Sequence, residues 1–450
     1  MTGKEVLFTV LKVAIMIGFT LNLGGLLTWA DRRQSSMIQD RIGPNRAVIK
    51  IGKFELRVWG LLHTAADGVK FFFKEDFMPP RADRVLFSIA PMLAVASVLA
   101  MLAVVPFGDT LCIAQWKDVV PRSGVCSSDP ASGAYAIELM IAPLAAGILY
   151  VFAVAGQGII AAAMAGASSD NKFSLMGGLR AASQMVSYEV TLGLSLIAAM
   201  MLYGTVRLDV MVQWQAEHAW GIFAQPIAFV LFFAASVAES KRIPFDLPEA
   251  ESELVSGYFT EYSGMKFGMF YLAEYMEVVT SSLLIVTIFL GGWALPFIHR
   301  DGVTVALGDH LLFHKDLPHA LVIGLGVLGF FGKVVVTCLL QTFVRWSLPR
   351  FRYDQLMRLG WRILLPASLA NIFVTGVVWL ALENAGEGVA GSVKIAADVT
   401  QFVVALTVPL VVLRLIVGYF TPTSRGTWLV GSSATMAAGQ GGTKASPMQA

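Results

Sequence analysis

Acidic side chains crowd one short loop of the sequence. Residues 241–265 read KRIPFDLPEAESELVSGYFTEYSGM. Together with Glu239, which lies just before this range, the loop carries six carboxylates: Glu239, Asp246, Glu249, Glu251, Glu253 and Glu261. Pro244 and Pro248 prevent a continuous helix through this loop. Carboxylates held close together raise one another's pKa, so a cluster of this kind can take up and release protons near neutral pH. A solvated acidic loop or a docking surface is the plainer interpretation, and spacing alone favours it.

Three further acids fall inside apolar runs. Glu189 lies in SQMVSYEVTLGL, whereas Glu274 and Glu277 lie one helical turn apart in FYLAEYMEVV. An ionised side chain at the centre of a bilayer costs at least ~2.5 kcal/mol on insertion scales, so such acids are candidates for ion or proton pathways. We therefore expect Glu189 and Glu274 to face an internal wet path. The alternative is a structural ion pair, for which Lys333 in a later apolar run is an available partner.

A third pattern lies in residues 31–84. Helical spacing places a polar stripe along one side of LLHTAADGVKFFFKED: His63, Asp67, Lys70 and Lys74. Phe72 belongs to the opposite, apolar side. The pattern predicts an amphipathic helix lying along the membrane surface, suited to the mouth of a site for a lipophilic substrate with a polar head. A plain interfacial helix, or one packed on a soluble partner, fits the same periodicity.

Membrane spans must position these residues. The composition is 56% hydrophobic and 14% charged, whereas soluble domains carry roughly 25% charge. A spanning helix needs about 20 apolar residues. We expect nine spans, near residues 5–30, 85–106, 135–164, 183–204, 221–240, 266–297, 319–346, 362–383 and 398–420. The sequence thus predicts an all-α, polytopic membrane protein with one transmembrane domain over residues 1–420 and a disordered tail over 421–450, which is rich in Gly, Ser and Ala.

The distribution of basic residues predicts an orientation. Lysines and arginines gather in segments 31–84 and 345–362 and are sparse in the loops on the opposite face. The positive-inside rule places the basic segments, and by alternation the acidic loop, in the cytoplasm, with the N-terminus on the periplasmic side. Cys112 and Cys126 then lie outside, where a disulfide could persist. Two unpaired loop thiols are the alternative.

Other motifs argue against further functions. The sequence has no CxxC pair and no Cys/His cluster, so we expect no metal and no cofactor bound by this chain. Gly324, Gly326 and Gly329 satisfy GxGxxG, but they lie in a span with no preceding strand, where helix packing explains them better than a dinucleotide. A net charge of +2 gives no support for nucleic-acid binding.

Several stretches, in order along roughly residues 25 to 375, carry a resemblance to a known family: RIGPNR, ADGVKFFFKED, SLMGGLRAASQMVSYEV, ESKRIPFDLPEAESELVSGYFTEYSGMKF, FYLAEY and LPRFRYDQLMRLGWRILLPASLANI. They resemble the signature segments of the H subunit of bacterial NADH–quinone oxidoreductase (respiratory complex I), the mitochondrial subunit 1 family. A string as long as PFDLPEAESELVSGYFTEYSGMKF is highly specific, so several such strings in order exclude a chance match.

The resemblance implies a subunit of the bacterial cytoplasmic membrane that anchors a soluble redox arm, forms most of a quinone tunnel and begins a proton-transfer path. It assigns the proton path and coupling loop to Glu189, Glu239, Asp246, Glu249, Glu251, Glu253, Glu261 and Glu274. It assigns the tunnel mouth to Asp31, Arg32, Arg41, Asp67 and Phe72. FMN and the iron–sulfur clusters are implied to belong to partner subunits, as are most of the groups that hold the quinone head. Other complex I subunits, quinone and phospholipid are the expected partners.

The chain also departs from the family pattern. The family usually has Glu-Arg where this chain has Asp31-Arg32, and the loop usually read GWAS is GASS at residues 166–169, without a tryptophan. A homologous anchor subunit of a membrane-bound hydrogenase, or of a ferredoxin- or F420H2-driven complex, is the alternative function. A secondary transporter or a purely structural anchor is a third, but the inverted repeats typical of transporters are not evident.

Overall fold

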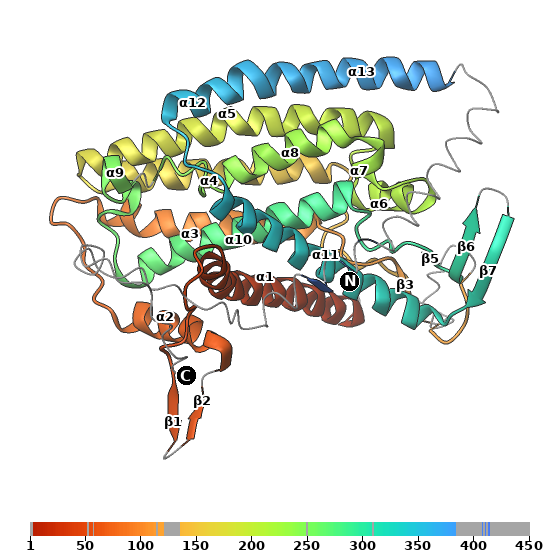
Figure 1. The fold of residues 1–450 in the computed structure, drawn as a ribbon, viewed down its shortest axis with the longest axis horizontal. Helices are drawn as coiled ribbons and strands as arrows, with labels where there is room; N and C mark the ends of the chain where they lie inside the picture. Colours follow the sequence, from red (N-terminus) through yellow and green to blue (C-terminus); the bar gives the residue numbers. More distant parts are fainter. Residues whose placement is uncertain are drawn as a thin grey trace, which may run out of the picture.

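The computed structural model describes residues 3–51, 54–56, 58–113, 116–120, 136–248, 251–307 and 310–383, with positions 407, 410, 413 and 414. Long helices run side by side along its longest axis (Figure 1). They are α1 (Gly3–Ile38), α3 (Arg84–Met101), α4 (Gly147–Ser168), α5 (Lys172–Tyr203), α8 (Pro226–Glu239), α10 (Gly264–Phe289), α11 (His319–Ser347) and α13 (Leu365–Glu383). Within these ranges, seven helices are long and apolar enough to cross a membrane, and α8 is shorter.

Eight expected spans therefore have a matching helix, since α8 accompanies the seven longer ones, and the expected α-helical membrane fold is confirmed. The ninth expected span, 398–420, lies outside the described residues apart from positions 407, 410, 413 and 414. The count of nine stays a prediction, as does the disordered tail over 421–450.

Two expected helix starts are wrong. The third span begins at Gly147 rather than near residue 135, because Pro143 interrupts the apolar run and the chain before it is extended beside the end of α3, with Ala142 N donating to Ala103 O at 2.8 Å. The fourth span begins at Lys172 rather than near residue 183. Its moderately polar first turns are packed against α4 and the loop after α9 instead of lying in water.

Two expected helix ends are also wrong. The first span continues to Ile38 rather than ending near residue 30. The sixth span stops at Phe289 rather than near residue 297. Gly291 and Gly292 follow it with φ of +73° and +50°, a conformation that favours glycine and ends a helix.

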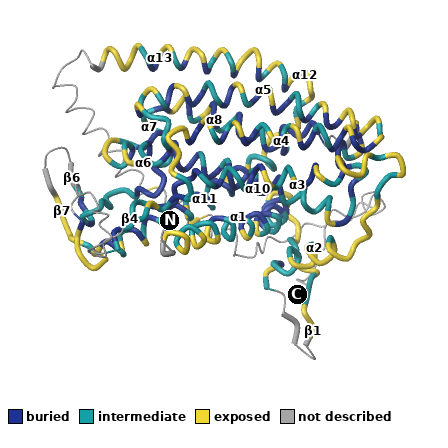
Figure 2. The backbone as a smooth tube through the Cα atoms, turned by 180° about the vertical axis from the view of Figure 1, so that it is seen from behind, coloured by how far each residue is buried: buried dark blue, intermediate teal, exposed yellow. Residues whose placement is uncertain are grey.

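The core of the bundle lies around α10. This helix contacts α1, α3, α8 and α11, and a larger share of it is buried than of any other of the seven long helices. Figure 2 shows this central burial and, by contrast, the exposed outer side of α13. Tyr275 and Leu283 of α10 pack with Leu27 of α1 and Phe330 of α11 in one apolar cluster.

Short elements mark the two ends of the bundle (Figure 1). One, the α2 end, carries α2 (Leu62–Phe73), α9 (Glu251–Leu254), α12 (Tyr353–Arg358) and the strands β1 (Ile49–Ile51) and β2 (Phe54–Leu56). The expected amphipathic helix is thus present as α2. Basic segment 31–84 and the acidic loop lie at this same end, which agrees with the expected alternation of loops, although the side of the membrane is not fixed by it.

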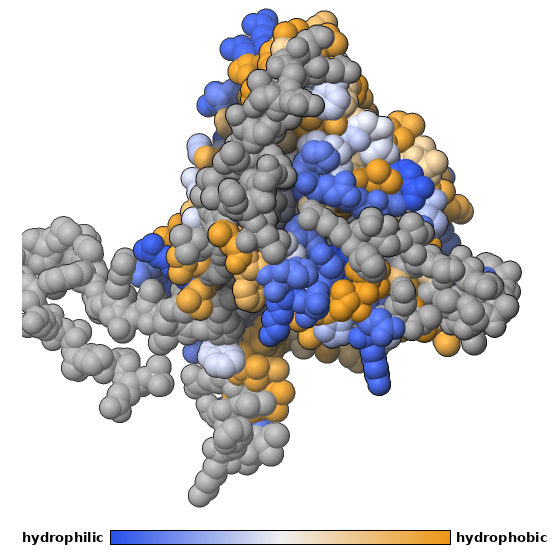
Figure 3. Space-filling model, turned by 90° about the vertical axis from the view of Figure 1, so that its right-hand side faces the viewer, coloured by the Kyte–Doolittle hydropathy of each residue, from blue (hydrophilic) through white to orange (hydrophobic). Residues whose placement is uncertain are grey.

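The opposite, hairpin end carries α6 (Leu208–Glu217), α7 (Gly221–Ala224) and an antiparallel sheet of β5 (Ile298–His299), β6 (Gly302–Leu307) and β7 (His310–Asp316). Strands β3 (Leu111–Cys112) and β4 (Ala136–Ile137) pair beside it. Strands β3, β5, β6 and β7 occupy segments that were expected to be loops, whereas β4 lies within the range expected for the third span. Figure 3 views this end, and among its coloured residues hydrophilic side chains near the middle are mixed with apolar ones.

Helices α4 and α5 form a tight antiparallel pair through glycines. A Cβ built on Gly166 of α4 would lie 2.7 Å from Ser174 O and 3.0 Å from Gly178 Cα, both backbone atoms of α5. A Cβ on Gly156, in the same helix, meets nothing within 4 Å. Small residues at such contacts allow helix backbones to approach closely in a membrane.

We predict that Gly166→Val lowers the stability of the purified, detergent-solubilised assembly by about 1–3 kcal/mol, the usual cost of overpacking. Gly156→Val is the matched control and is expected to leave the thermal midpoint nearly unchanged. Thermal unfolding followed by size-exclusion chromatography measures both variants. Equal midpoints for the two would contradict the close packing of α4 on α5.

Candidate functional site

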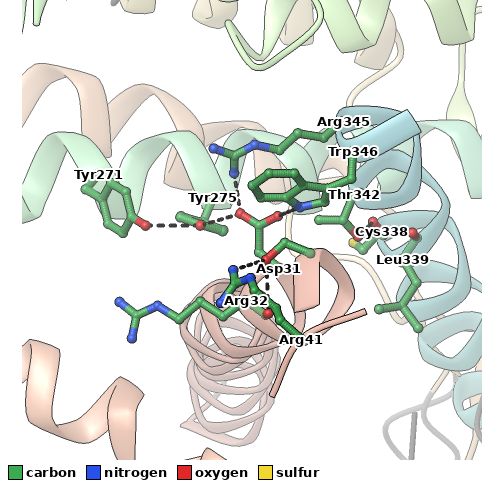
Figure 4. A network of polar contacts seen from close by, with 11 residues as sticks. Asp31, Arg32, Arg41, Tyr271, Tyr275, Cys338, Leu339, Thr342, Arg345 and Trp346 are labelled. Carbon is green, nitrogen blue, oxygen red and sulfur yellow. Dashed lines mark hydrogen bonds and ion pairs between the residues drawn. The ribbon is translucent and has the colours of Figure 1, made fainter. Parts of the chain in front are cut away.

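The buried carboxylate of Asp31 joins three helices (Figure 4). Asp31 lies on α1 and is 5% exposed. Its Oδ2 accepts hydrogen bonds from Arg345 of α11 and, at 3.0 Å, from the Tyr275 hydroxyl of α10. Its Oδ1 accepts from Trp346 Nε1 at 2.6 Å. The Tyr271 hydroxyl lies 3.1 Å from that of Tyr275 and extends the network along α10. Asp31, expected at a tunnel mouth, is thus the buried junction of α1, α10 and α11.

The other expected mouth residues lie where α1 meets α2. Arg32 Nη2 is 2.5 Å from Asp67 Oδ2 on α2. Arg41 turns back to α1 and donates to Ser35 Oγ at 3.0 Å. Phe72 lies on the other side of α2 and is 71% exposed. The structure therefore brings Arg32 and Asp67 together beside the Asp31 network, with an uncovered apolar face next to them, whereas Arg41 bonds back to the end of α1.

The first part of the acidic loop is buried. Residues 244–248 are all buried. Gln184 of α5 holds the bend through Nε2, which donates 2.7 Å hydrogen bonds to the carbonyl oxygens of residues 238 and 245. Asp246 is 3% exposed and forms an ion pair with Arg350, which follows α11. The solvated-loop interpretation is therefore wrong for this part of the loop.

The second part of the loop is more open. Glu253 is exposed and accepts a 2.7 Å bond from Arg180 Nη1 on α5. Glu261 accepts a 2.6 Å bond from Asn171 Nδ2. Both acids thus hold the loop against the start of α5. Glu249 and the side chain of Glu251 lie outside the described residues.

A buried lysine faces three carboxylates where α8 meets α10. Lys241 has a side chain only 6% exposed, and its Nζ lies 3.0 Å from Glu277 Oε1. Burial lowers the pKa of Lys241, but the nearby carboxylates of Glu277, Glu274 and Glu239 more than offset this, so the pKa lies above its ordinary value. Lys241 is therefore an ammonium at neutral pH. We call Lys241, Glu239, Glu274 and Glu277 the Lys241 cluster.

The Lys241 cluster opens onto a cavity between α3, α4, α5, α8 and α10. The cavity holds about 750 Å³, counting the part open to its surroundings. Glu239 and Glu277 line one end of it with hydroxyl groups: Ser97, Ser236, Ser240, Thr280 and Ser281. Its other lining residues are apolar or glycine, for example Phe152, Leu196 and Ile288. A polar end with ionisable groups and several hydroxyls is suited to hydrated proton transfer.

Glu189 lies on the same side of the bundle. It is half-buried on α5 and interacts electrostatically with Glu239. The neighbouring Tyr188 is buried, and its hydroxyl donates to Leu356 O at 3.0 Å, which fixes this turn of α5 against α12. The structure thus brings Glu189, Glu239 and Glu274 to one region, as expected for parts of one path.

Lys333 is not the partner of the acids on α10. Its Nζ donates to the carbonyl oxygens of Leu290, Gly292 and Ala294 at 2.8, 3.0 and 2.6 Å, and it lies 4.4 Å from the centroid of the Trp220 ring. Three acceptors satisfy the three N–H groups of an ammonium. The suggested pairing of Glu274 or Glu277 with Lys333 is therefore wrong, because Lys333 caps the far end of α10 instead.

The cysteines and histidines show no metal centre among the described residues. His319 accepts a 3.1 Å hydrogen bond from Cys112 N, and His314 lies 2.9 Å from Asp316. Cys112 takes part in a disulfide, Cys338 is a free buried thiol, and Cys126 lies outside the described residues.

Sequence reasoning missed several parts of this site. It noted Glu277 but assigned it no role. It also gave no role to Lys241 or to Arg242, whose guanidinium lies 3.5 Å from the centroid of the Tyr275 ring. The sequence feature that could have revealed these roles is the Lys-Arg pair directly after an apolar run, because it places two cations at the depth of the acids on α10.

A family model described as NADH dehydrogenase matches residues 11–376. The chain belongs to this family. It is 42% identical over 349 residues to the NADH-quinone oxidoreductase H subunit 1 of Cytophaga hutchinsonii, covering 78% of this chain and 90% of that one. It is 41% identical over 370 residues to the H subunit 2 of Geobacter metallireducens, covering 82% and 94%. It is 40% identical over 369 residues to the H subunit of Flavobacterium johnsoniae, again covering 82% and 94%.

Membership of the NADH dehydrogenase family confirms the resemblance drawn from the signature stretches. The matched range contains the Asp31 network, the mouth residues on α2 and the whole Lys241 cluster. Within this matched range, the carboxylate of Asp31 reaches Arg345, Trp346 and Tyr275 together.

We predict that Asp31→Asn costs about 3–5 kcal/mol of stability, because it leaves the partly buried Arg345 without its counter-charge. Asp31→Glu keeps the charge and is expected to retain most of the stability. The control is Asp209→Asn, which breaks a 2.6 Å pair with the more exposed Arg207 and should cost about 0–1 kcal/mol. Thermal midpoints of the detergent-purified assembly measure all three, and a midpoint for Asp31→Asn no lower than the control's would refute the role of Asp31.

Proposed function

We propose that this chain is the membrane subunit of a proton-translocating NADH–quinone oxidoreductase, complex I. In this role it admits quinone at the α2 end, carries the first part of the proton path and anchors the soluble redox arm. The curated relatives are by name H subunits of NADH-quinone oxidoreductase and match most of this chain. The observation that carries the proposal is the Lys241 cluster, because an inert membrane anchor has no need to gather three buried or partly buried carboxylates around one lysine.

The α2 end suits the entry of a quinone, which has a long lipophilic tail and a polar head. Helix α2 is amphipathic and buries none of its residues. Its exposed Phe72 and Phe73 face away from the Asp67–Arg32 ion pair. A tail can therefore lie against the apolar face while the head passes the polar groups at the junction with α1. FMN, the iron–sulfur clusters and the site where the quinone head is reduced belong to partner subunits in this proposal.

The Lys241 cluster couples this entry to proton movement. Reduction of a quinone to a quinol takes up two electrons and two protons, which creates a local demand for positive charge. Carboxylates that share one ammonium respond to such a demand, since protonating one of them changes the charge felt by the others. Tyr275 connects the two regions physically, because its hydroxyl binds Asp31 and its ring contacts Arg242, the residue after Lys241.

The alternative function was an anchor subunit of a membrane-bound hydrogenase or of a ferredoxin- or F420H2-driven complex. The names of the relatives do not favour it. The electron donor is set by partner chains, so purification distinguishes the two functions directly.

The test is to tag this chain in its host, purify it in mild detergent and record the flavin and iron–sulfur absorbance of the material. NADH-to-quinone activity is then measured with and without an inhibitor of the quinone site. We expect flavin, clusters and inhibitor-sensitive activity to co-purify with the chain. A large complex with nickel and no NADH activity would instead establish the hydrogenase-type function.

We predict that Glu239→Gln lowers quinone-linked turnover by about 10²-fold, in the range contributed by a positioned proton-transfer group. NADH oxidation by ferricyanide, which bypasses the membrane path, should be unchanged. Glu217→Gln, at the hairpin end, is the control and should leave both activities intact. Loss of both activities in Glu239→Gln would indicate failed assembly and would contradict a role confined to proton transfer.

A further inference from the structure

Glu277 is the member of the Lys241 cluster to which neither the sequence pattern nor the proposed function gives a role. It lies on α10 one turn after Glu274, and its carboxylate lines the cavity together with Glu239. We propose that Glu277 is a further proton-carrying residue, which receives protons from Glu239 at its Oε2 and is held in place by Lys241. This inference rests on the proposed proton path and names the residue that continues it.

The two oxygens of Glu277 have different surroundings. Oε1 accepts a hydrogen bond from Lys241 Nζ at 3.0 Å. Oε2 is shielded from solvent and has no hydrogen-bond partner among the described residues. An unpaired buried carboxylate oxygen is costly, and protonation of this oxygen removes much of that cost. The ion pair therefore orients the carboxylate and leaves one oxygen available for a proton.

The cavity gives a proton access to this carboxylate. A Cβ built on Gly158 of α4 would lie 3.9 Å from Glu277 Oε1 and 3.7 Å from Ser97 Oγ, so the glycine leaves the space beside the carboxylate open. Thr280 and Ser281, on the next turn of α10, line the same cavity beyond Glu277. The polar lining thus includes hydroxyls on the turn of α10 that follows Glu277.

The charges of the cluster require shared protons. Lys241 is the lysine that faces Glu239, Glu274 and Glu277, and Glu189 of α5 adds a fourth acid near Glu239. From the other elements around the cavity, α3 and α4, the lining residues are uncharged. Arg242 is directed to the ring of Tyr275. Three ionised carboxylates around one ammonium would be too costly in a buried site, so the cluster holds protons at neutral pH.

The proposed step is balanced. Protonated Glu239 gives its proton to the Glu277 carboxylate, so Glu239 becomes ionised and Glu277 becomes neutral while the total charge of the cluster stays constant. Lys241 remains an ammonium throughout, and its strongest attraction passes from Glu277 to the carboxylates of Glu239 and Glu274. No electron and no further reactant takes part in this step.

The test is a double-mutant cycle in the intact complex: Glu277→Gln, Lys241→Met and the combination of both. Quinone-linked turnover and protons moved per electron in inverted membrane vesicles are the readouts, and ferricyanide activity reports assembly. Glu277→Gln should lower turnover roughly tenfold or more, whereas Glu277→Asp should restore most of it. The double variant should remain as slow as Glu277→Gln, because removing the lysine does not replace the lost proton carrier.

Recovery of turnover in the double variant would overturn the inference, since it would show that Glu277 serves only to neutralise Lys241. The double variant also provides the test if Glu277→Gln alone fails to assemble, because it leaves no ammonium without its partner. Glu239→Gln is measured alongside. A slow Glu239→Gln with a fast Glu277→Gln refutes this inference and leaves the proposed function standing, whereas fast turnover in both refutes the proposed function as well. Asp209→Asn serves as the control for a broken ion pair at the hairpin end.

Discussion

The ammonium of Lys241 lies against carboxylates of α8 and α10 with little access to water. Removing ions from water costs several kcal/mol for each, and attraction between them offsets this only when the geometry is good. The rest of the bundle supplies that geometry. Gln184 of α5 holds the bend that follows α8, and it thereby fixes the position of the backbone that carries Lys241. Because the acids on α10 must meet Lys241, the rotation of α10 is fixed, and this rotation also directs Tyr275 towards Asp31.

The Asp31 network extends the same constraint to α1 and α11. Its carboxylate binds groups from α10 and α11 at once, so the α2 end of the bundle has little freedom to shear. Arg32, the next residue, reaches α2 through Asp67. A change of charge in the Lys241 cluster is therefore separated from the proposed quinone entry by only Arg242, Tyr275 and Asp31, which are in contact. This is a contiguous physical link, and coupling energies between variants would measure its strength.

The features that could be predicted from the sequence are those that follow from a local pattern of residues. Apolar runs located the spans, and helical period located α2 and placed Glu274 and Glu277 on one face. The predictions were wrong where contacts between distant parts of the chain determine a helix boundary or a side-chain partner. Pro143 ended an apolar run that composition alone extended, and the polar start of α5 is covered by packing that no local window shows. Asp31 and Arg345 are 314 positions apart, and Lys333 was a plausible partner for the acids until the tilt of α11 placed it beside carbonyl groups.

The buried Lys241 and the partly buried Lys333 illustrate why depth in the bundle does not by itself define a role. Lys333 is surrounded by three carbonyl oxygens and an indole ring, none of which titrates. No carboxylate is among these partners, so they hold the end of α10 in place whatever the protonation of the acids. Lys241 is surrounded by carboxylates, and each of them can lose its charge to a proton. The charge around Lys241 therefore changes with the protonation of its neighbours, unlike the charge around Lys333. The chemistry of the groups around each lysine, rather than its burial, separates the end of α10 held by Lys333 from the end where we propose that protons move.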